Sequence, residues 1–210
     1  MNQVTAEQLL ISPEEYLEGE PYAEVRHEYI DGEVYAMAGA GDAHVKVSLN
    51  CAFLLKTHLK GSGCSTYISD MKVRIGDDIA ENKAFFYPDV MVCCDPFDQQ
   101  PEQNYVKQLP KLIIEVLSPS TEANDRGRKF LLYRGIPSLE EYILLNPEEY
   151  LLERYSRQAD NQWLITTYKE ADAMVEFDSI NFSCTLADFY DDVVFEKQDS
   201  ADSNPLPENT

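Results

Sequence analysis

Two carboxylates stand in segments whose other residues are almost all apolar. Glu115 interrupts the run KLIIEVLS, residues 111–118, and Asp89 follows Pro88 in FFYPDVMVCC, residues 85–94. A strand of this kind is normally buried on both faces, and an ionised carboxylate is costly to bury without a partner. Glu115 therefore needs a basic side chain, a raised pKa that leaves it neutral, or a bound cation.

The two carboxylates would converge if their strands pair. Proline restricts a strand to its beginning or to an edge, so Asp89 would emerge where its strand meets the strand of Glu115. Two like charges close together in an apolar pocket repel strongly, and a divalent cation is the commonest remedy. Taken alone, Asp89 also fits a turn or a strand-end cap, and Glu115 also fits an ordinary buried salt bridge.

A lysine lies on the helix predicted to follow Glu115. Asp125, Lys129 and Tyr133 are spaced by four residues, which places them along one face of that helix. Lys129 could reach back from there to the end of the strand. The other interpretation is an Asp125–Lys129 surface pair, worth only about a few tenths of a kcal/mol.

The elements that position these residues begin with a short helix and a hairpin. The motif SPEE at residues 12–15 is a capping box with proline at the first helical position, which predicts a helix over Pro13–Leu17. Asp31-Gly32 is the dipeptide that best forms a type I′ turn, which predicts a hairpin over residues 26–37.

The middle of the chain predicts an α/β fold. Asp42 is expected to cap a helix that Gly61 ends. Its apolar residues recur at helical spacing: Val45, Leu49, Ala52, Phe53 and Leu59. Strands are predicted over 66–75, 84–94, 111–117 and 141–146, and a helix over 122–134. This order predicts a mixed central sheet flanked by helices, and the alternating pattern over 150–168 adds a C-terminal β-hairpin extension.

Composition limits the classes of protein that this chain can belong to. Its 210 residues include 17 Lys+Arg and 38 Asp+Glu, a formal charge of −21, which argues against a dedicated electropositive DNA-binding surface. The apolar stretches are shorter than the roughly 20 residues of a membrane span, and residues 1–20 carry no secretory signal, so we expect a cytoplasmic protein. We expect one domain over 1–195 and a polar, disordered tail over 196–210.

Cysteine and histidine patterns argue against zinc. The five Cys have no CxxC spacing, and the three His form no HExxH motif. A chain of this length can bury a hydrophobic core without disulfides or a structural metal.

The acidic motifs resemble a known family. The residues that carry the resemblance are PDV at 88–90, EVLSPST at 115–121, Asp125, Lys129, Tyr133, EYIDGEVYAM at 28–37 and EEYILLNPE at 140–148. They are similar to the Uma-type restriction endonuclease family, a branch of the PD-(D/E)XK nuclease superfamily that is abundant in cyanobacteria. The resemblance extends from about Ser12 to Phe195, and EVLSPST is its most specific part.

The resemblance implies a restriction-endonuclease-like core, a four-stranded mixed sheet between two helices. Asp89 and Glu115 then fill the two acidic positions, and with the backbone carbonyl of Val116 they would hold Mg²⁺ or Mn²⁺. The superfamily's usual lysine lies two residues after the second acid, where this chain has Leu117. Lys129 on the following helix would replace it, to orient or deprotonate the attacking water or to stabilise charge on the phosphate.

Other residues are weaker candidates. Glu33 is either a further acidic group or a solvated hairpin carboxylate, and His44 either contacts phosphate or caps its helix. A basic cluster beside the site either contacts DNA or is solvated: Arg126, Arg128, Lys129 and Arg134. The resemblance also favours a homodimer.

The sequence supports two main hypotheses. The first is a Mg²⁺-dependent endonuclease that hydrolyses DNA phosphodiester bonds, although so acidic a chain should bind duplex weakly and with strong salt sensitivity. The second is a binding or regulatory module that keeps the nuclease core but does not cleave, which Leu117 and the net charge favour. A two-carboxylate glycosidase is a weaker third, because Trp163 alone supplies no aromatic sugar platform.

Overall fold

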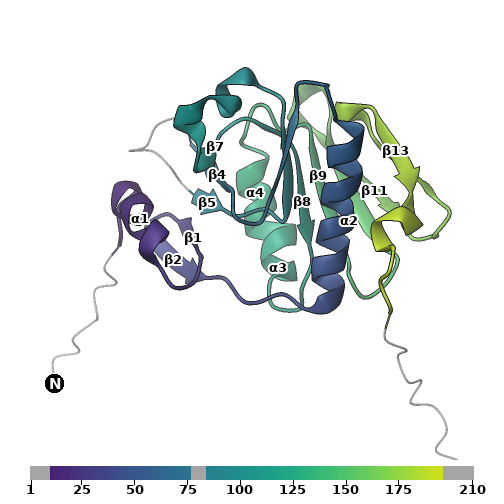
Figure 1. Cartoon of the computed structure of the whole chain (residues 1–210), viewed down its shortest axis with the longest axis horizontal. Helices are drawn as coiled ribbons and strands as arrows, with labels where there is room; N and C mark the ends of the chain where they lie inside the picture. The colour runs from purple at the N-terminus through teal and green to yellow at the C-terminus, as the bar shows by residue number, and fades with distance from the viewer. Residues whose placement is uncertain (1–9, 77–83, 196–210) are drawn as a thin grey trace, which may run out of the picture.

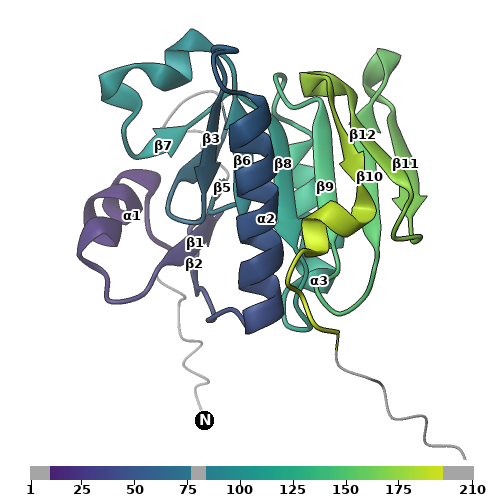
Figure 2. The ribbon, with the colours of Figure 1, turned by 45° about the vertical axis from the view of Figure 1, so that its right-hand side comes forward.

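The structure, a computed structural model, describes residues 10–76 and 84–195. The strands of its central sheet are β3 (Ser65–Ile68), β6 (Val90–Cys93), β8 (Pro110–Val116), β9 (Glu141–Leu145), β10 (Leu152–Arg157) and β11 (Trp163–Tyr168). They lie in the order β11-β10-β9-β8-β6-β3; Figure 1 labels β11, β9 and β8, and Figure 2 labels all six strands. Only β8 and β9 run parallel in this sheet, so it is mixed, as predicted. The predicted C-terminal hairpin supplies β10 and β11, which extend the sheet beyond the four strands expected.

A second sheet packs beside the first. Its strands are β1 (His27–Ile30), β2 (Glu33–Ala36), β4 (Lys72–Ile75), β5 (Ala84–Phe86) and β7 (Val106–Lys107), in the order β2-β1-β5-β4-β7. A two-stranded sheet near the C-terminus consists of β12 (Met174–Phe177) and β13 (Phe182–Thr185). The helices are α1 (Pro13–Gly19), α2 (Asp42–His58), α3 (Glu122–Asn124) and α4 (Phe130–Tyr133), with a π-helical turn over Asp125–Lys129. Short 3-10 turns cover Glu20–Tyr22, Pro96–Gln99, Pro101–Gln103, Ala159–Asn161, Asp178–Ile180 and Leu186–Tyr190.

The central sheet is covered on both faces. Helix α2 lies along one face, where Cys51 and Leu55 pack in one core with Ile114 (Figure 2). On the other face, Tyr133 of α4 packs in a second core with Ile113. Because side chains alternate along a strand, Glu115 shares the face of Ile113 and points toward α4.

Helix α2 buries a different stripe from the one its pattern suggested. Two apolar stripes with four-residue spacing run along this helix, and periodicity alone does not choose between them. The structure buries Val47, Cys51 and Leu55. Of the predicted set, Leu59 is buried and Ala52 packs partly buried against the same core, whereas the stripe of Val45, Leu49 and Phe53 is exposed. The helix also starts differently, because Gly41 is its N-cap and Asp42 makes no capping hydrogen bond.

Two predicted strands are each divided between the two sheets. The segment 66–75 forms β3 and β4, and the segment 84–94 forms β5 and β6. The chain leaves the central sheet at Ser69, which has a positive φ of 32°, and enters it after Pro88, which has no N–H to donate. The two crossings touch, since the N–H of Ser69 donates to the carbonyl of Asp89 at 3.2 Å. Asp89 therefore lies at the boundary between the sheets.

Other predictions are confirmed. The capping box of Ser12 and Glu15 forms at the start of α1, and Asp31-Gly32 forms the turn between β1 and β2 with positive φ at both residues. The single domain over 1–195 stays a proposal, and the predicted tail over 196–210 lies outside the described residues. Among the helices that the structure describes, none has the length and apolar character required to cross a membrane.

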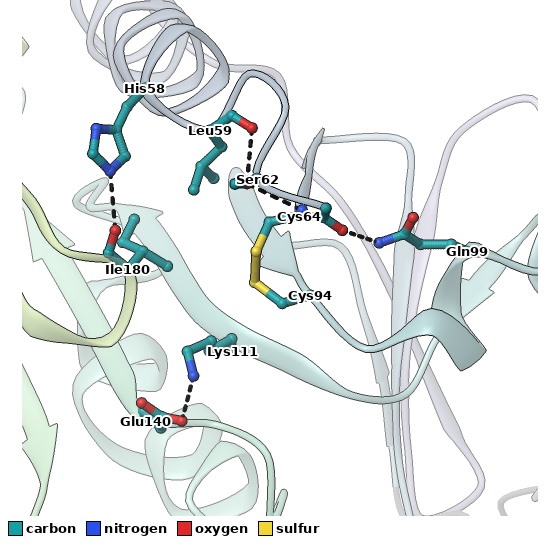
Figure 3. The surroundings of a disulfide bond; sticks show 10 residues. His58, Leu59, Ser62, Cys64, Cys94, Gln99, Lys111, Glu140 and Ile180 are labelled. Carbon is teal, nitrogen blue, oxygen red and sulfur yellow. Dashed lines mark hydrogen bonds and ion pairs between the residues drawn. A yellow bond between two sulfur atoms is a disulfide. The ribbon is translucent and has the colours of Figure 1, made fainter.

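A disulfide that the sequence pattern did not indicate joins Cys64 to Cys94 (Figure 3). It links the turn after α2 to the residue that follows β6, and Ser62 donates its hydroxyl to the carbonyl of Leu59 in the same turn. The remaining cysteines are free: Cys51, Cys93 and Cys184. Spacing could not reveal the bond, because the two cysteines meet only through the pairing of β3 with β6.

The pairing predicts a defined labelling result. After denaturation without reductant, an alkylating reagent should modify three cysteines, and after reduction it should modify all five. Mass spectrometry of the intact chain measures the number of labels. Five labels in the unreduced protein would show that Cys64 and Cys94 are thiols.

Candidate active site

The strands bring the two predicted carboxylates together. In the antiparallel pair of β6 and β8, Val90 lies opposite Ile114, so Asp89 and Glu115 are neighbours across the pair. The backbone N–H of Asp89 is 3.4 Å from Oε2 of Glu115, and the N–H of Val116 donates to Oδ2 of Asp89 at 2.7 Å. The convergence expected from the apolar runs is therefore present.

Lys129 points into this cluster. Its Nζ lies 3.3 Å from Oε1 of Glu115, 2.8 Å from Oε1 of Glu28 and 3.4 Å from Oδ1 of Asp125. The hydroxyl of Tyr133 donates to Oε1 of Glu115 at 2.9 Å. Lys129 is only 6% exposed and Asp125 only 2%, so their pair is buried and the surface-pair interpretation is wrong.

A local widening of the helix holds this lysine. The predicted regular helix over 122–134 contains a π-helical turn over Asp125–Lys129, with Gly127 at its centre. Turns of this kind change which side chains share a face and are frequent at functional sites. Here the turn keeps both of its end residues, Asp125 and Lys129, buried on the side of Glu115.

The hairpin supplies a different acid from the one predicted. Glu28 of β1 reaches Lys129, whereas Glu33 of β2 accepts a hydrogen bond from the hydroxyl of Tyr35. Glu28 is 9% exposed, which makes it another charged residue in a buried strand. The reasoning applied to Glu115 would have identified Glu28, had the burial of β1 been known.

His44 contacts the other carboxylate. Its Nε2 lies 2.9 Å from Oδ1 of Asp89, and its Nδ1 is buried without a hydrogen-bond partner. The predicted capping role is wrong, because Gly41 caps α2 and no side chain completes that cap. His44 instead connects the start of α2 to the carboxylate at the start of β6.

An open groove of about 1220 Å³ runs past these residues. Among its lining residues are Asp89, Glu115, Lys129, His44, Arg128 and the hydroxyl-bearing Ser118, Ser120 and Thr121. Arg126 turns elsewhere and pairs with Glu122 at 2.8 Å and with Glu153. Of the predicted basic cluster, Arg128 and Lys129 therefore face the groove.

The cluster holds more acidic than basic side chains, and burial makes its two central carboxylates costly to ionise. Burial raises the pKa of Asp89, against the opposing effect of His44. Burial also raises the pKa of Glu115 well above its usual value, although Lys129 opposes the shift. Burial alone would lower the pKa of Lys129, but the carboxylates of Glu115, Glu28 and Asp125 raise it well above its usual value. Lys129 is thus firmly protonated, and one ammonium faces several carboxylates.

The donor set fits a hard divalent cation. Lys129 and Tyr133 occupy Oε1 of Glu115, while Oε2 faces Asp89. Adjacent desolvated carboxylates are the ligands that Mg²⁺ and Mn²⁺ prefer, and a cation would offset the cost of ionising them. Over residues 10–76 and 84–195, no group of three His, Cys, Asp or Glu is arranged as a metal site, and the predicted set has two acidic side chains.

Several known proteins are similar to this chain. Two proteins of Synechocystis sp. (strain ATCC 27184 / PCC 6803 / Kazusa) carry the names "Uncharacterized protein slr1290" and "Uncharacterized protein sll1609". The first is 38% identical over 185 residues and covers 88% of this chain and 94% of its own length. The second is 35% identical over 174 residues and covers 83% and 96%.

A solved structure shares the fold. The crystal structure of "a putative nuclease belonging to DUF820" from Anabaena variabilis ATCC 29413 superposes with a TM-score of 0.71 at 19% identity. The alignment covers 86% of this chain and 98% of that chain. The model of the Uma2 family, described as "Putative restriction endonuclease", matches residues 13–187. The predicted resemblance is confirmed, and the chain belongs to the Uma2 family.

Proposed function

We propose that this protein is a metal-dependent DNA endonuclease that hydrolyses phosphodiester bonds. The chain has a nuclease fold, its family is described as "Putative restriction endonuclease", and its structural neighbour is described as "a putative nuclease". The observation that carries the proposal is the meeting of Asp89, Glu115 and Lys129 beside an open groove.

The acids would hold the metal. In this proposal Asp89, Glu115 and the carbonyl of Val116 are ligands of Mg²⁺ or Mn²⁺. Such an ion, when bound, acidifies water and neutralises charge that develops on the scissile phosphate. His44 supports the first ligand, because its contact with Oδ1 fixes the orientation of the Asp89 carboxylate.

Lys129 would act as an electrostatic group. A lysine serves as a general base only when its pKa is lowered to near neutrality, and the surrounding carboxylates raise the pKa of Lys129. Its ammonium therefore stays charged, orients the attacking water and stabilises the negative phosphate in the transition state. Glu28 and Asp125 hold that ammonium beside Glu115.

DNA would lie along the groove. Ser118, Ser120, Thr121 and Arg128 line it, and hydroxyl and guanidinium groups are common contacts to phosphate oxygens. Binding should be weak and sensitive to salt, because the chain carries a charge of −21. A homodimer and a cytoplasmic location also stay proposals, and the disulfide is a bond that oxidising compartments favour.

Nicking of supercoiled plasmid with Mg²⁺ or Mn²⁺ tests the proposal. We expect Asp89→Asn to lower the rate at least about 100-fold, because it removes a charged metal ligand. Asp172→Asn, which changes an exposed aspartate, is the matched control and should keep the wild-type rate.

The assay also tests the second candidate, a module that binds but does not cleave. Leu117, which takes the position of the superfamily's usual lysine, is 3% exposed within the apolar core and favours this candidate. Its signature would be saturable Mn²⁺ binding that requires Asp89 and Glu115, with no nicking under any condition. Nicking that survives Asp89→Asn would refute both candidates at this site.

A further inference from the structure

Helix α2 presents an apolar stripe to solvent. Val45, Leu49 and Phe53 follow one another at four-residue spacing and are 53%, 62% and 68% exposed. Their side chains lie on the opposite side of the helix from Val47 and Cys51, which pack on the central sheet. Large apolar residues scattered singly are normal on a surface, but an aligned set is typical of an interface.

The edge of the sheet extends this face. Ile68 of the edge strand β3 is 53% exposed and pairs with Val90 of β6. Residues directly opposite each other in an antiparallel pair point to the same side of the sheet. Val90 packs in the core beneath α2, so Ile68 lies on the α2 face. Figure 2 shows α2 in front of the sheet, beside β3.

The outward face of α2 is self-complementary. Leu49 is its centre, with Val45 four residues before it and Phe53 four residues after it. Asp42 precedes Leu49 by seven residues and Lys56 follows it by seven, and both are exposed. If two copies of α2 pack antiparallel about a two-fold axis at Leu49, each Val45 meets a Phe53 and each Asp42 meets a Lys56.

We propose that this face is the interface of a symmetric homodimer, with α2 packed against α2 of a second copy. A nucleic acid would not suit it, because an apolar stripe offers phosphates no partners. Most of the surface of a chain with a charge of −21 repels a second copy. The α2 face is an exception, since it is apolar at its centre, carries Lys56 at one end, and at the other carries Asp42, an exposed carboxylate that also pairs with Lys46 of the same helix at 3.1 Å.

The dimer would place the two grooves at opposite ends of the helix pair. His44, which lines the groove, precedes Leu49 by five residues. The two His44 positions would therefore lie about 15 Å apart along the paired axes, from the rise of 1.5 Å per residue. The interface itself does not depend on the proposed function, because its argument uses only the outer face of α2.

Analytical ultracentrifugation of the full chain tests the interface. The wild type should sediment as a dimer of twice 24.0 kDa at micromolar concentration. Leu49→Asp should weaken the dimer at least about 100-fold, because a two-fold axis makes each substitution act twice. Leu164→Asp changes a leucine of β11 that is 56% exposed and should leave the dimer intact. Circular dichroism checks that both variants fold.

A charge exchange tests the antiparallel arrangement. Asp42→Lys should weaken the dimer because it places two lysines opposite each other, and adding Lys56→Asp should restore the wild-type affinity. Leu49→Cys should form a disulfide-linked dimer, whereas Leu164→Cys should not. The proposal would be overturned by any of three results. The wild type is a monomer, the dimer survives Leu49→Asp, or the double exchange fails to restore the affinity. If a segment of the same chain covers Val45, Leu49 and Phe53 instead of a second copy, the wild type should be a monomer.

Discussion

Lys129→Met is expected to lower the free energy of unfolding at pH 8 by about 3–5 kcal/mol, the usual cost of leaving buried charges without a partner. Methionine preserves most of the volume, so the loss comes from the missing ammonium. Glu28, Glu115 and Asp125 each lie within 3.4 Å of Nζ, and the substitution leaves all three uncompensated. Urea denaturation followed by circular dichroism measures the change.

The deficit should shrink as the pH falls from 8 toward 5. The raised pKa of Lys129 keeps it protonated in both states throughout this range, so the lysine adds no pH dependence of its own. Burial raises the pKa of Glu115 in the folded state, and loss of Lys129 would raise it further. A carboxyl with a raised folded pKa binds protons more readily when folded, so the folded variant regains stability as the pH falls through that pKa.

Two further variants isolate the cause. Adding Glu28→Gln to Lys129→Met should recover about 1–2 kcal/mol, because it removes one of the uncompensated charges. Lys111→Met is the control, because the Lys111 side chain is 30% exposed and pairs with Glu140 near the surface. This substitution should lower the free energy of unfolding by less than about 1 kcal/mol. A small, pH-independent loss in Lys129→Met would mean that the lysine does not compensate the buried acids.

The sequence predicted the site residues where a charged side chain stands in an otherwise apolar segment. A charge within an apolar run is a local signal, and it identified Glu115 and Asp89 without any knowledge of tertiary structure. The spacing of Asp125, Lys129 and Tyr133 likewise requires only helical periodicity, which the π-helical turn widened but did not reverse. Local turn chemistry also predicted the hairpin at Asp31-Gly32 correctly.

The other features of the site and the fold could not be predicted, because they depend on contacts with residues far away in the sequence. Glu28 and Glu33 lie on the same face of the hairpin, because Ile30 pairs with Glu33 and side chains alternate along β1. The choice between them is set by the position along the hairpin that Lys129 reaches, and the hairpin sequence does not indicate that position. The buried stripe of α2 is set by the sheet, since both stripes are apolar at the same spacing. The predicted strand over 84–94 divides because its two halves pair with different neighbours, β5 with β1 and β4, and β6 with β3 and β8.

Glu115→Gln is expected to raise the stability while it abolishes metal binding. Burial raises the pKa of Glu115 well above its usual value, so the ionised side chain destabilises the folded state at neutral pH. Glutamine has the same shape, and its amide oxygen can accept the hydrogen bonds of Lys129 and Tyr133. Without metal at pH 8, the variant should be more stable than the wild type by about 1–2 kcal/mol.

The sign of the pH dependence is the opposite of that for a surface acid. A carboxyl whose folded pKa is raised contributes stability below its unfolded pKa of about 4.3 and loses it as the pH rises through the folded value. The advantage of Glu115→Gln should therefore be greatest at pH 8 and disappear near pH 4. Urea denaturation at both pH values, with a chelator present, measures it.

Adding metal should make the wild type more stable than Glu115→Gln. At a free Mn²⁺ concentration about 100 times its dissociation constant, a single site stabilises the folded state by about 2.7 kcal/mol. The wild type should gain this amount, whereas Glu115→Gln should gain little and should nick plasmid at least about 100-fold more slowly.

Glu141 of the neighbouring strand β9 provides the matched control. It is also buried, and burial raises its pKa, but it accepts hydrogen bonds from Ser179 and pairs with Arg154 at 2.7 Å. Glu141→Gln should therefore destabilise the protein, because it removes the buried carboxylate that pairs with Nε of Arg154 and leaves that guanidinium only the exposed carboxylate of Asp178. It should preserve the response to Mn²⁺. If Glu115→Gln and Glu141→Gln behave alike, then Glu115 is a structural acid, and the acidic cluster beside the groove does not hold a metal.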